Sequence, residues 1–141
     1  MVRKAGTEQS MTLRELSPDF DEWPERWMGL KVDLEYGKKL LPYMEEFLNN
    51  LIKRDLSRKT LKDHIDNTWL LGGSIIRQVS TYEEYKTAPL KKLTASVETG
   101  GMLPDGYDGM TERDLKAFER TCELFEEFLK KTTPKKKRRA G

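Results

Sequence analysis

The chain has 141 residues, with 26 Lys or Arg, 24 Asp or Glu, one His and one Cys. This length is typical of one domain, and a single cysteine excludes an intramolecular disulfide and a zinc site built from cysteines alone. No apolar run approaches the roughly 20 residues that a membrane-spanning helix needs, and the polar start contains no secretory signal. We therefore expect a soluble cytoplasmic protein that does not bind membranes.

The charge is distributed unevenly. The formal net charge of +2 divides into +5 in the tail and −3 in the rest of the chain. The tail cations are Lys135, Lys136, Lys137, Arg138 and Arg139. Because the body is acidic, contact with nucleic acid has to use the tail or a local patch. The strongest local positive density in the body comes from Lys53, Arg54, Arg58, Lys59 and Lys62.

The first 30 residues show no lasting helical or alternating period, and two prolines interrupt them. We therefore expect residues 1–30 to form a mostly irregular arm. Trp23 and Trp27 are too apolar for a solvated linker, so the arm is expected to pack on a helical body over residues 31–131. Residues 132–141 are polar and basic and are expected to form a disordered tail.

Two long helices are predicted within the body. Apolar residues at steps of three and four favour a helix over 32–54, which Pro42 is expected to kink or break. Ser57 is a typical N-cap for a second helix over 58–79. Inside that helix, the Gly72–Gly73 pair lets another helix approach closely. Alternatively, the same pair ends one helix and starts the next.

Shorter helices and one further long helix complete the pattern. Thr81 and Glu84 fit a capping box before a short helix, and Leu90, Leu93 and Val97 predict another short helix that ends at Gly100–Gly101. A loop with a Pro-Asp-Gly turn follows. Thr111 then caps a final helix over 112–131. The sequence thus predicts an all-α bundle of four to five helices.

Few residues suggest catalysis or metal binding. His64 has no second imidazole to share a metal and no evident acid–base partner, so a surface or core-edge position is expected. Cys122 lies on the apolar stripe of the last helix, which is typical of a buried structural thiol. Asp105 and Asp108 lack the regular oxygen spacing of a calcium loop. We expect no enzyme activity, no cofactor and no small-molecule substrate.

The start of the second long helix is the most informative segment. Helix N-termini attract anions through free amides and the macrodipole, and Ser57 and Thr60 add hydroxyl groups there. An anion bound at this helix start would also lie near the five cations between residues 53 and 62. The plainer alternative is a capped helix with an exposed basic turn. The basic tail has three alternative interpretations: it contacts phosphates, it directs nuclear import, or it only aids solubility.

The stretch PYMEEFLNNLIKRDLSRKTLKDHIDNTWLLGGSIIRQV, within residues 40–80, resembles the core-binding (SAM-like N-terminal) domain of tyrosine recombinases, the phage-integrase type. That family shows an amphipathic helix, a short turn and a Ser-x-x-Thr start to the next helix, which Ser57 and Thr60 match here. The resemblance implies a helical bundle that grips one side of a DNA duplex, with these two residues on phosphates. The family's catalytic Arg, His and Tyr set has no counterpart, so strand cleavage is not expected.

We therefore predict a non-catalytic DNA-binding protein that contacts duplex phosphates with weak sequence preference, as an accessory to a mobile genetic element. The acidic body departs from the family pattern and leaves open that the fold is kept while DNA binding is lost. The alternative is a helical protein–protein interaction module, which includes homodimerisation. Trp23, Trp27, Trp69 and the five tyrosines exceed what a small bundle must bury, so some are expected to face a partner.

Overall fold

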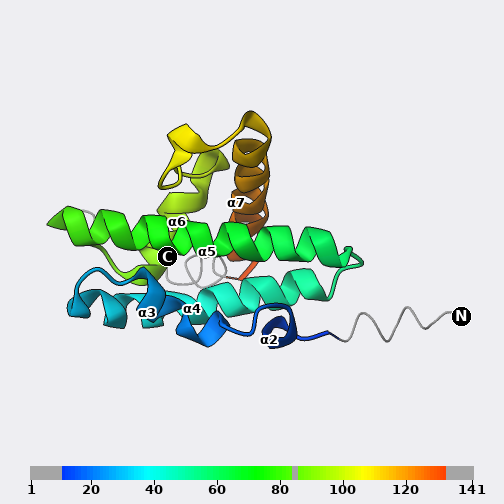
Figure 1. Ribbon diagram of the computed structural model, residues 1–141, viewed down its shortest axis with the longest axis horizontal. Helices are drawn as coiled ribbons and strands as arrows, with labels where there is room; N and C mark the ends of the chain where they lie inside the picture. Colours follow the sequence, from blue (N-terminus) through cyan, green and yellow to red (C-terminus); the bar gives the residue numbers. More distant parts are fainter. Residues whose placement is uncertain (1–10, 84–85, 133–141) are drawn as a thin grey trace, which may run out of the picture.

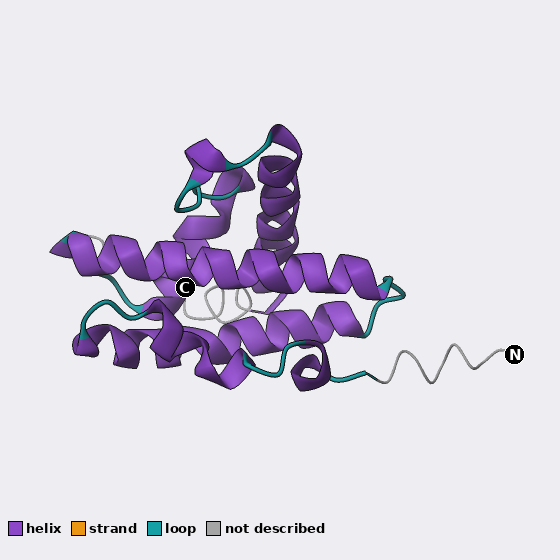
Figure 2. Cartoon of the chain, viewed as in Figure 1, coloured by secondary structure: helices purple, strands orange, loops and turns teal. Residues whose placement is uncertain are grey.

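A computed structural model describes residues 11–83 and 86–132. Within these residues the chain forms helices and no strand, so the predicted all-α class is confirmed (Figure 2). The α-helices are α2 (Leu13–Leu16), α3 (Trp23–Trp27), α4 (Lys31–Ile52), α5 (Arg58–Thr81), α6 (Pro89–Val97) and α7 (Glu112–Thr132). Short 3₁₀ segments lie between them at η1 (Phe20–Glu22), η3 (Glu98–Gly100) and η4 (Tyr107–Gly109).

The helices form two crossing layers (Figure 1). α4 and α5 lie side by side in opposite directions, and α3 packs against both of them. α6 and α7 pass behind α5 at a steep angle and contact each other. One hydrophobic cluster runs through both layers, from Leu13 in α2 to Leu129 in α7. None of the helices in the described ranges has an apolar stretch long enough to cross a membrane.

α4 passes through Pro42 as one helix, so the break predicted there does not occur. Pro42 is exposed, whereas the side chains of Leu40, Met44 and Phe47 are fully buried. A proline inside a helix costs about 3 kcal/mol, and each buried large apolar side chain contributes roughly 1.5–3 kcal/mol. Packing of the buried face therefore keeps α4 continuous.

α5 is one continuous helix, as predicted, and not two helices joined at Gly72–Gly73. The Ser57 hydroxyl accepts a hydrogen bond from the Thr60 amide at 3.1 Å, which confirms Ser57 as the N-cap. The predicted helix start at Thr81 is wrong, because Thr81 is the last residue of α5. Glu84, the other half of the predicted capping box, lies outside the described residues.

α6 and α7 correspond to the two helices predicted last in the chain, although α6 ends at Val97, before the predicted end at Gly100–Gly101. α6 begins at Pro89, a favourable first position because the missing amide hydrogen would have no helical partner there. The Asp114 amide donates to the Thr111 hydroxyl at 3.0 Å, which confirms the predicted cap of α7. On the buried face of α7, Phe125 stacks on Phe47 of α4 with ring centroids 4.1 Å apart. This contact joins the two layers.

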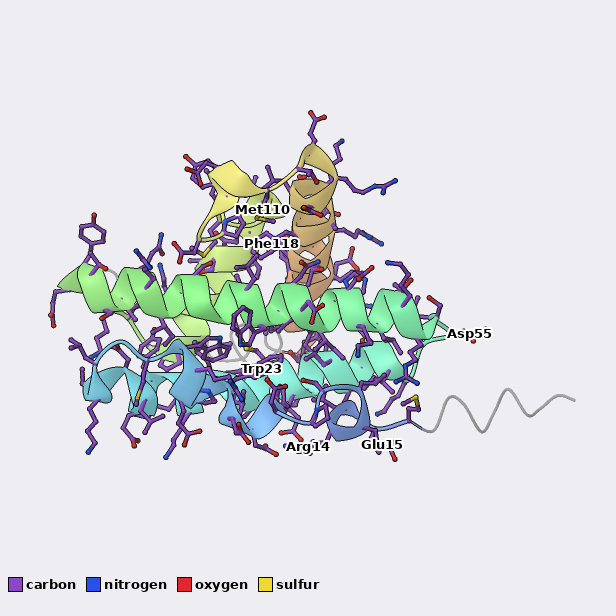
Figure 3. The ribbon with its side chains drawn as sticks, viewed as in Figure 1. Arg14, Glu15, Trp23, Asp55, Met110 and Phe118 are labelled. Carbon is purple, nitrogen blue, oxygen red and sulfur yellow. The ribbon has the colours of Figure 1, made fainter. Side chains whose placement is uncertain are left out.

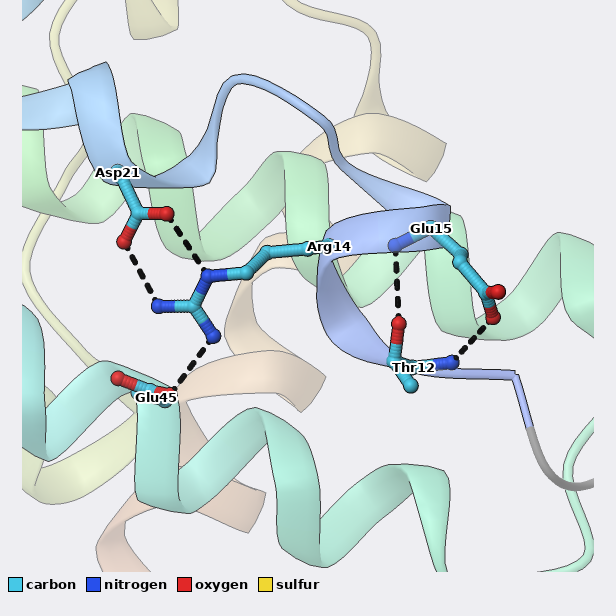
Figure 4. Close-up of polar contacts among 5 residues, drawn as sticks. All are labelled: Thr12, Arg14, Glu15, Asp21 and Glu45. Carbon is cyan, nitrogen blue, oxygen red and sulfur yellow. Dashed lines mark hydrogen bonds and ion pairs between the residues drawn. The ribbon is translucent and has the colours of Figure 1, made fainter.

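The segment before α4 is more regular than predicted. It contains α2, η1 and α3, and it buries the large side chains of Leu13, Leu16, Phe20, Trp23 and Trp27. The sequence carries a signal for α2 that the periodicity missed, a capping box (Figure 4). The Thr12 amide donates to the Glu15 carboxylate at 2.8 Å, and the Glu15 amide donates to the Thr12 hydroxyl at 3.2 Å.

Arg14 joins this segment to α4. Its guanidinium donates two hydrogen bonds to Asp21, at 2.8 and 2.7 Å, and a third to Glu45 of α4 at 2.8 Å (Figure 4). These bonds with Arg14 hold the pKa of the Asp21 carboxyl below its ordinary value. The buried aromatic side chains and this polar contact together fix the segment on the body.

Candidate nucleic-acid interface

The predicted phosphate-binding residues of the body gather at one end of the molecule, where α4 ends and α5 begins. Lys53 follows the last residue of α4, and Asp55 lies at the tip of the connecting turn (Figure 3). The turn therefore brings the cations that precede Asp55 and those that follow it to the same end of the fold.

The hydroxyl groups at the start of α5 bond to each other. Ser57 Oγ donates to Thr60 Oγ1 at 3.0 Å while it accepts from the Thr60 amide. The amides of Arg58 and Lys59 occupy the first two helical positions and have no carbonyl acceptor within the helix. An anion at this end would thus meet those two amides before the hydroxyl groups.

The cations predicted for the patch are all exposed, but they differ in their partners. Lys59 Nζ forms an ion pair with Asp63 at 3.1 Å, and Arg54 donates to the side-chain oxygen of Asn50 at 3.4 Å. Both side chains are therefore partly committed within the protein.

Lys53, Arg58 and Lys62 form no ion pair with any residue in the described part of the chain. Arg58 Nη1 makes a long contact of 3.9 Å with the sulfur of Met11, which carries no charge. These three cations are the ones that remain available to an external anion.

Carboxylates limit how far the positive charge extends. Those near the patch are Asp55, Asp63 and Asp66, so residues 53–66 carry five cations against three acids and a net charge of +2. Burial raises the pKa of Asp66, and the nearby charge of Lys62 opposes that rise. A neighbouring hollow of about 590 Å³ between α5 and α7 is lined by side chains of both signs. The cationic surface is therefore confined to the connecting turn and the first two turns of α5.

His64 lies at the edge of the core, as predicted. It is 9 % exposed, and its Nδ1 is 2.8 Å from Oγ1 of Thr121 on α7. Asn67 donates to the same hydroxyl at 3.0 Å. Burial lowers the pKa of His64, while the charge of Asp63 raises it less. This polar cluster therefore links α5 to α7, which is a structural role.

Cys122 is fully buried, as predicted for a structural thiol. Burial, with a smaller contribution from Glu119 and Glu123, raises its pKa to about 12. Such a thiol stays protonated near neutral pH and is a poor nucleophile. Across residues 11–83 and 86–132, no group of three or more His, Cys, Asp or Glu side chains is placed to hold a metal ion.

The three tryptophans have different environments. Trp23 and Trp27 are buried, whereas Trp69 is 41 % exposed on α5. The Trp69 side chain borders a hollow of about 370 Å³ that runs along α5. Periodicity alone did not identify this surface, because the apolar run around Trp69 does not indicate which side faces solvent.

The tail cations Lys135, Lys136, Lys137, Arg138 and Arg139 lie outside the described residues. Comparisons with protein-family models, with curated proteins and with solved structures found no match to this chain. The case for a function therefore rests on the sequence and on the geometry described above.

Proposed function

We propose that this protein binds duplex DNA without cleaving it, through the turn between α4 and α5. The observation that carries the proposal is the set of three exposed cations, Lys53, Arg58 and Lys62, that form no ion pair with a residue in the described ranges. The free amides of Arg58 and Lys59 lie at the same helix start. The resemblance to recombinase core-binding domains points to the same segment, and an accessory role in a mobile genetic element follows from that resemblance.

The proposed contact is with phosphates and not with bases. Cations and helix amides at one N-terminus form a site for a phosphate group, and such contacts carry no sequence information. Three phosphate contacts predict that the logarithm of the binding constant falls with the logarithm of salt concentration at a slope of about −3. We accordingly expect weak sequence preference and steep salt dependence.

The experiment is fluorescence anisotropy of a labelled duplex across a salt series. Lys53→Glu/Arg58→Glu is expected to weaken binding and to reduce the slope by about 2. Lys38→Glu/Lys39→Glu changes the charge equally on an exposed part of α4 and is expected to retain the slope. Loss of binding in both variants would show that overall charge, and not the turn, accounts for the affinity.

A chain ending at Thr133 separates the tail from the turn. If deletion of the tail abolishes binding while Lys53→Glu/Arg58→Glu does not weaken it, the proposed site is wrong. If the full chain fails to bind DNA even at low salt, the function is wrong.

A second candidate function, protein interaction, is supported by a different surface. Trp69 on α5 is exposed, and Leu103 and Tyr107 are exposed beside a hollow that residues of α5 also line. Exposed apolar side chains that gather in one place are typical of interaction sites. Lys53 and Arg58, which the DNA-binding test changes, are not part of this surface, so this candidate can be tested separately.

A further inference from the structure

The described part of the chain exposes several large apolar side chains, and some of them border hollows along α5. Within the described residues these side chains are Met28, Leu30, Val32, Trp69, Tyr82, Leu103 and Tyr107. Trp69 borders the hollow of about 370 Å³ along α5, and Leu103 and Tyr107 border an adjoining hollow of about 250 Å³. Arg77 and Asp105 line both hollows.

One side of α5 is not covered by another described helix, and the helical spacing gives the residues on that side. At steps of three and four it presents Lys62, Asp66, Trp69, Gly73, Arg77 and Ser80. All of these are exposed except Gly73, which is half-buried. α5 lies in front of α6 and α7 in Figure 1, and no described helix is drawn over it. We call these six residues the α5 stripe.

The α5 stripe is complementary to itself. Trp69 and Gly73 lie two residues before and two residues after Leu71. Asp66 lies five residues before it and Arg77 six residues after it. When two copies of a helix cross in opposite directions at this level, the large Trp69 faces the small Gly73 of the other copy. The acidic Asp66 then faces the basic Arg77 of the other copy. Each contact occurs twice, as a two-fold interface requires.

We propose that a second copy of this chain packs antiparallel on the α5 stripe. This inference deepens the second candidate function, on which it rests, by naming the partner. An acidic partner would be repelled by Asp66 and a basic partner by Arg77, whereas a second copy satisfies both charges.

Both charged residues are free to change partner. Arg77 makes one ion pair, with Asp105 at 3.4 Å, and both of these side chains are at least half exposed. Asp66 forms no ion pair with any residue in the described ranges, although the charge of Lys62 on the same helix lies near it. Pairing across the interface therefore breaks one weak, solvated contact in each copy.

The test is sedimentation velocity of the full chain, from the micromolar range to several hundred micromolar. The wild type is expected to form a dimer. Asp66→Arg and Arg77→Asp each place like charges in contact and are expected to raise the dimer dissociation constant by about tenfold or more. The double variant Asp66→Arg/Arg77→Asp restores opposite charges across the interface and is expected to recover dimerisation.

The rescue is specific to the interface. Asp66 and Arg77 are eleven residues apart on one helix, or about 16 Å, so the double variant cannot restore a contact within one chain. Trp69→Ala is expected to weaken the dimer without unfolding the chain, which circular dichroism checks. Glu127→Arg, an equal charge change on an exposed part of α7, is expected to leave the dimer unchanged.

A wild type that stays monomeric over the whole range overturns the proposal. A dimer that persists in both single variants, or a double variant that remains monomeric, overturns this interface. Lys62 belongs to both surfaces, but the DNA-binding test changes Lys53 and Arg58, which lie outside the α5 stripe, and uses a different measurement, so the two proposals can fail separately.

Discussion

The indole ring of Trp27 lies directly over Gly72 of α5. A Cβ atom on this glycine would come within 2.8 Å of Cε2 of the ring, which is closer than side chains approach. The Trp27 Nε1–H also donates a hydrogen bond to the carbonyl oxygen of Trp69 at 3.1 Å. This pair of contacts attaches the segment before α4 to the middle of α5.

The first prediction concerns this contact. Gly72→Ala is expected to destabilise the fold by about 1–3 kcal/mol, because the added methyl group displaces the indole ring. That loss exceeds the gain of roughly 1 kcal/mol that alanine brings to a helix. Urea denaturation measures the free energy of unfolding.

Gly73→Ala is the matched control. A Cβ atom there would lie 3.3 Å from Cδ1 of Trp27, which a small shift of the ring accommodates. We therefore expect a change within about 1 kcal/mol. If Gly72→Ala were as stable as the wild type, Trp27 could not lie where the structure places it.

The close contact at Gly72 could be predicted from the sequence, but its partner could not. The apolar period places Gly72 on the buried stripe of α5, and a glycine there indicates a close neighbour. The neighbour is an indole ring from α3, which spans five residues. A helix of that length is too short to show a period, so the segment reads as irregular.

The candidate site could also be predicted in part. The N-cap at Ser57 follows from local chemistry, and the pairing of Lys59 with Asp63 follows from their i,i+4 spacing. The exposure of Trp69 does not follow in this way. Its chain neighbours Thr68, Leu70 and Leu71 are small or apolar, although Asp66, one turn earlier on the same face, is charged, so tertiary packing decides which of the apolar residues faces solvent.

The second prediction concerns His64 and pH. Burial lowers the pKa of His64 below its ordinary value of 6.5, so the unfolded chain binds a proton more readily than the folded one. Stability is therefore fully present above pH 6.5 and is lost as the pH falls toward the folded-state pKa. We expect the free energy of unfolding to decrease between pH 7.5 and pH 5.

His64→Gln removes the titrating group and is expected to flatten this part of the pH profile. Because the chain has one histidine, a single imidazole signal in an NMR titration reports the folded-state pKa directly. A midpoint at or above 6.5 would contradict the buried position of His64.

The third prediction concerns the reactivity of Cys122. With no exposed surface and a pKa of about 12, this thiol is expected to react with Ellman's reagent at pH 8 only when the chain opens. The rate of the same reaction in denaturant is the reference for an unprotected Cys122 thiol. Lys116→Cys places a second thiol on the exposed side of the same helix and is expected to react fast while Cys122 stays protected. Two equally fast thiols in the native protein would mean that α7 does not pack as described.

The fourth prediction concerns Arg14. Lysine keeps its charge but cannot make the paired hydrogen bonds to Asp21 together with the bond to Glu45. Because these side chains are largely exposed, we expect Arg14→Lys to lower the free energy of unfolding by at most about 1 kcal/mol. The control is Arg120→Lys, which alters a single surface pair with Glu123 at 3.2 Å. It is expected to have a smaller effect, and equal losses in the two variants would show that the three-residue geometry adds no stability.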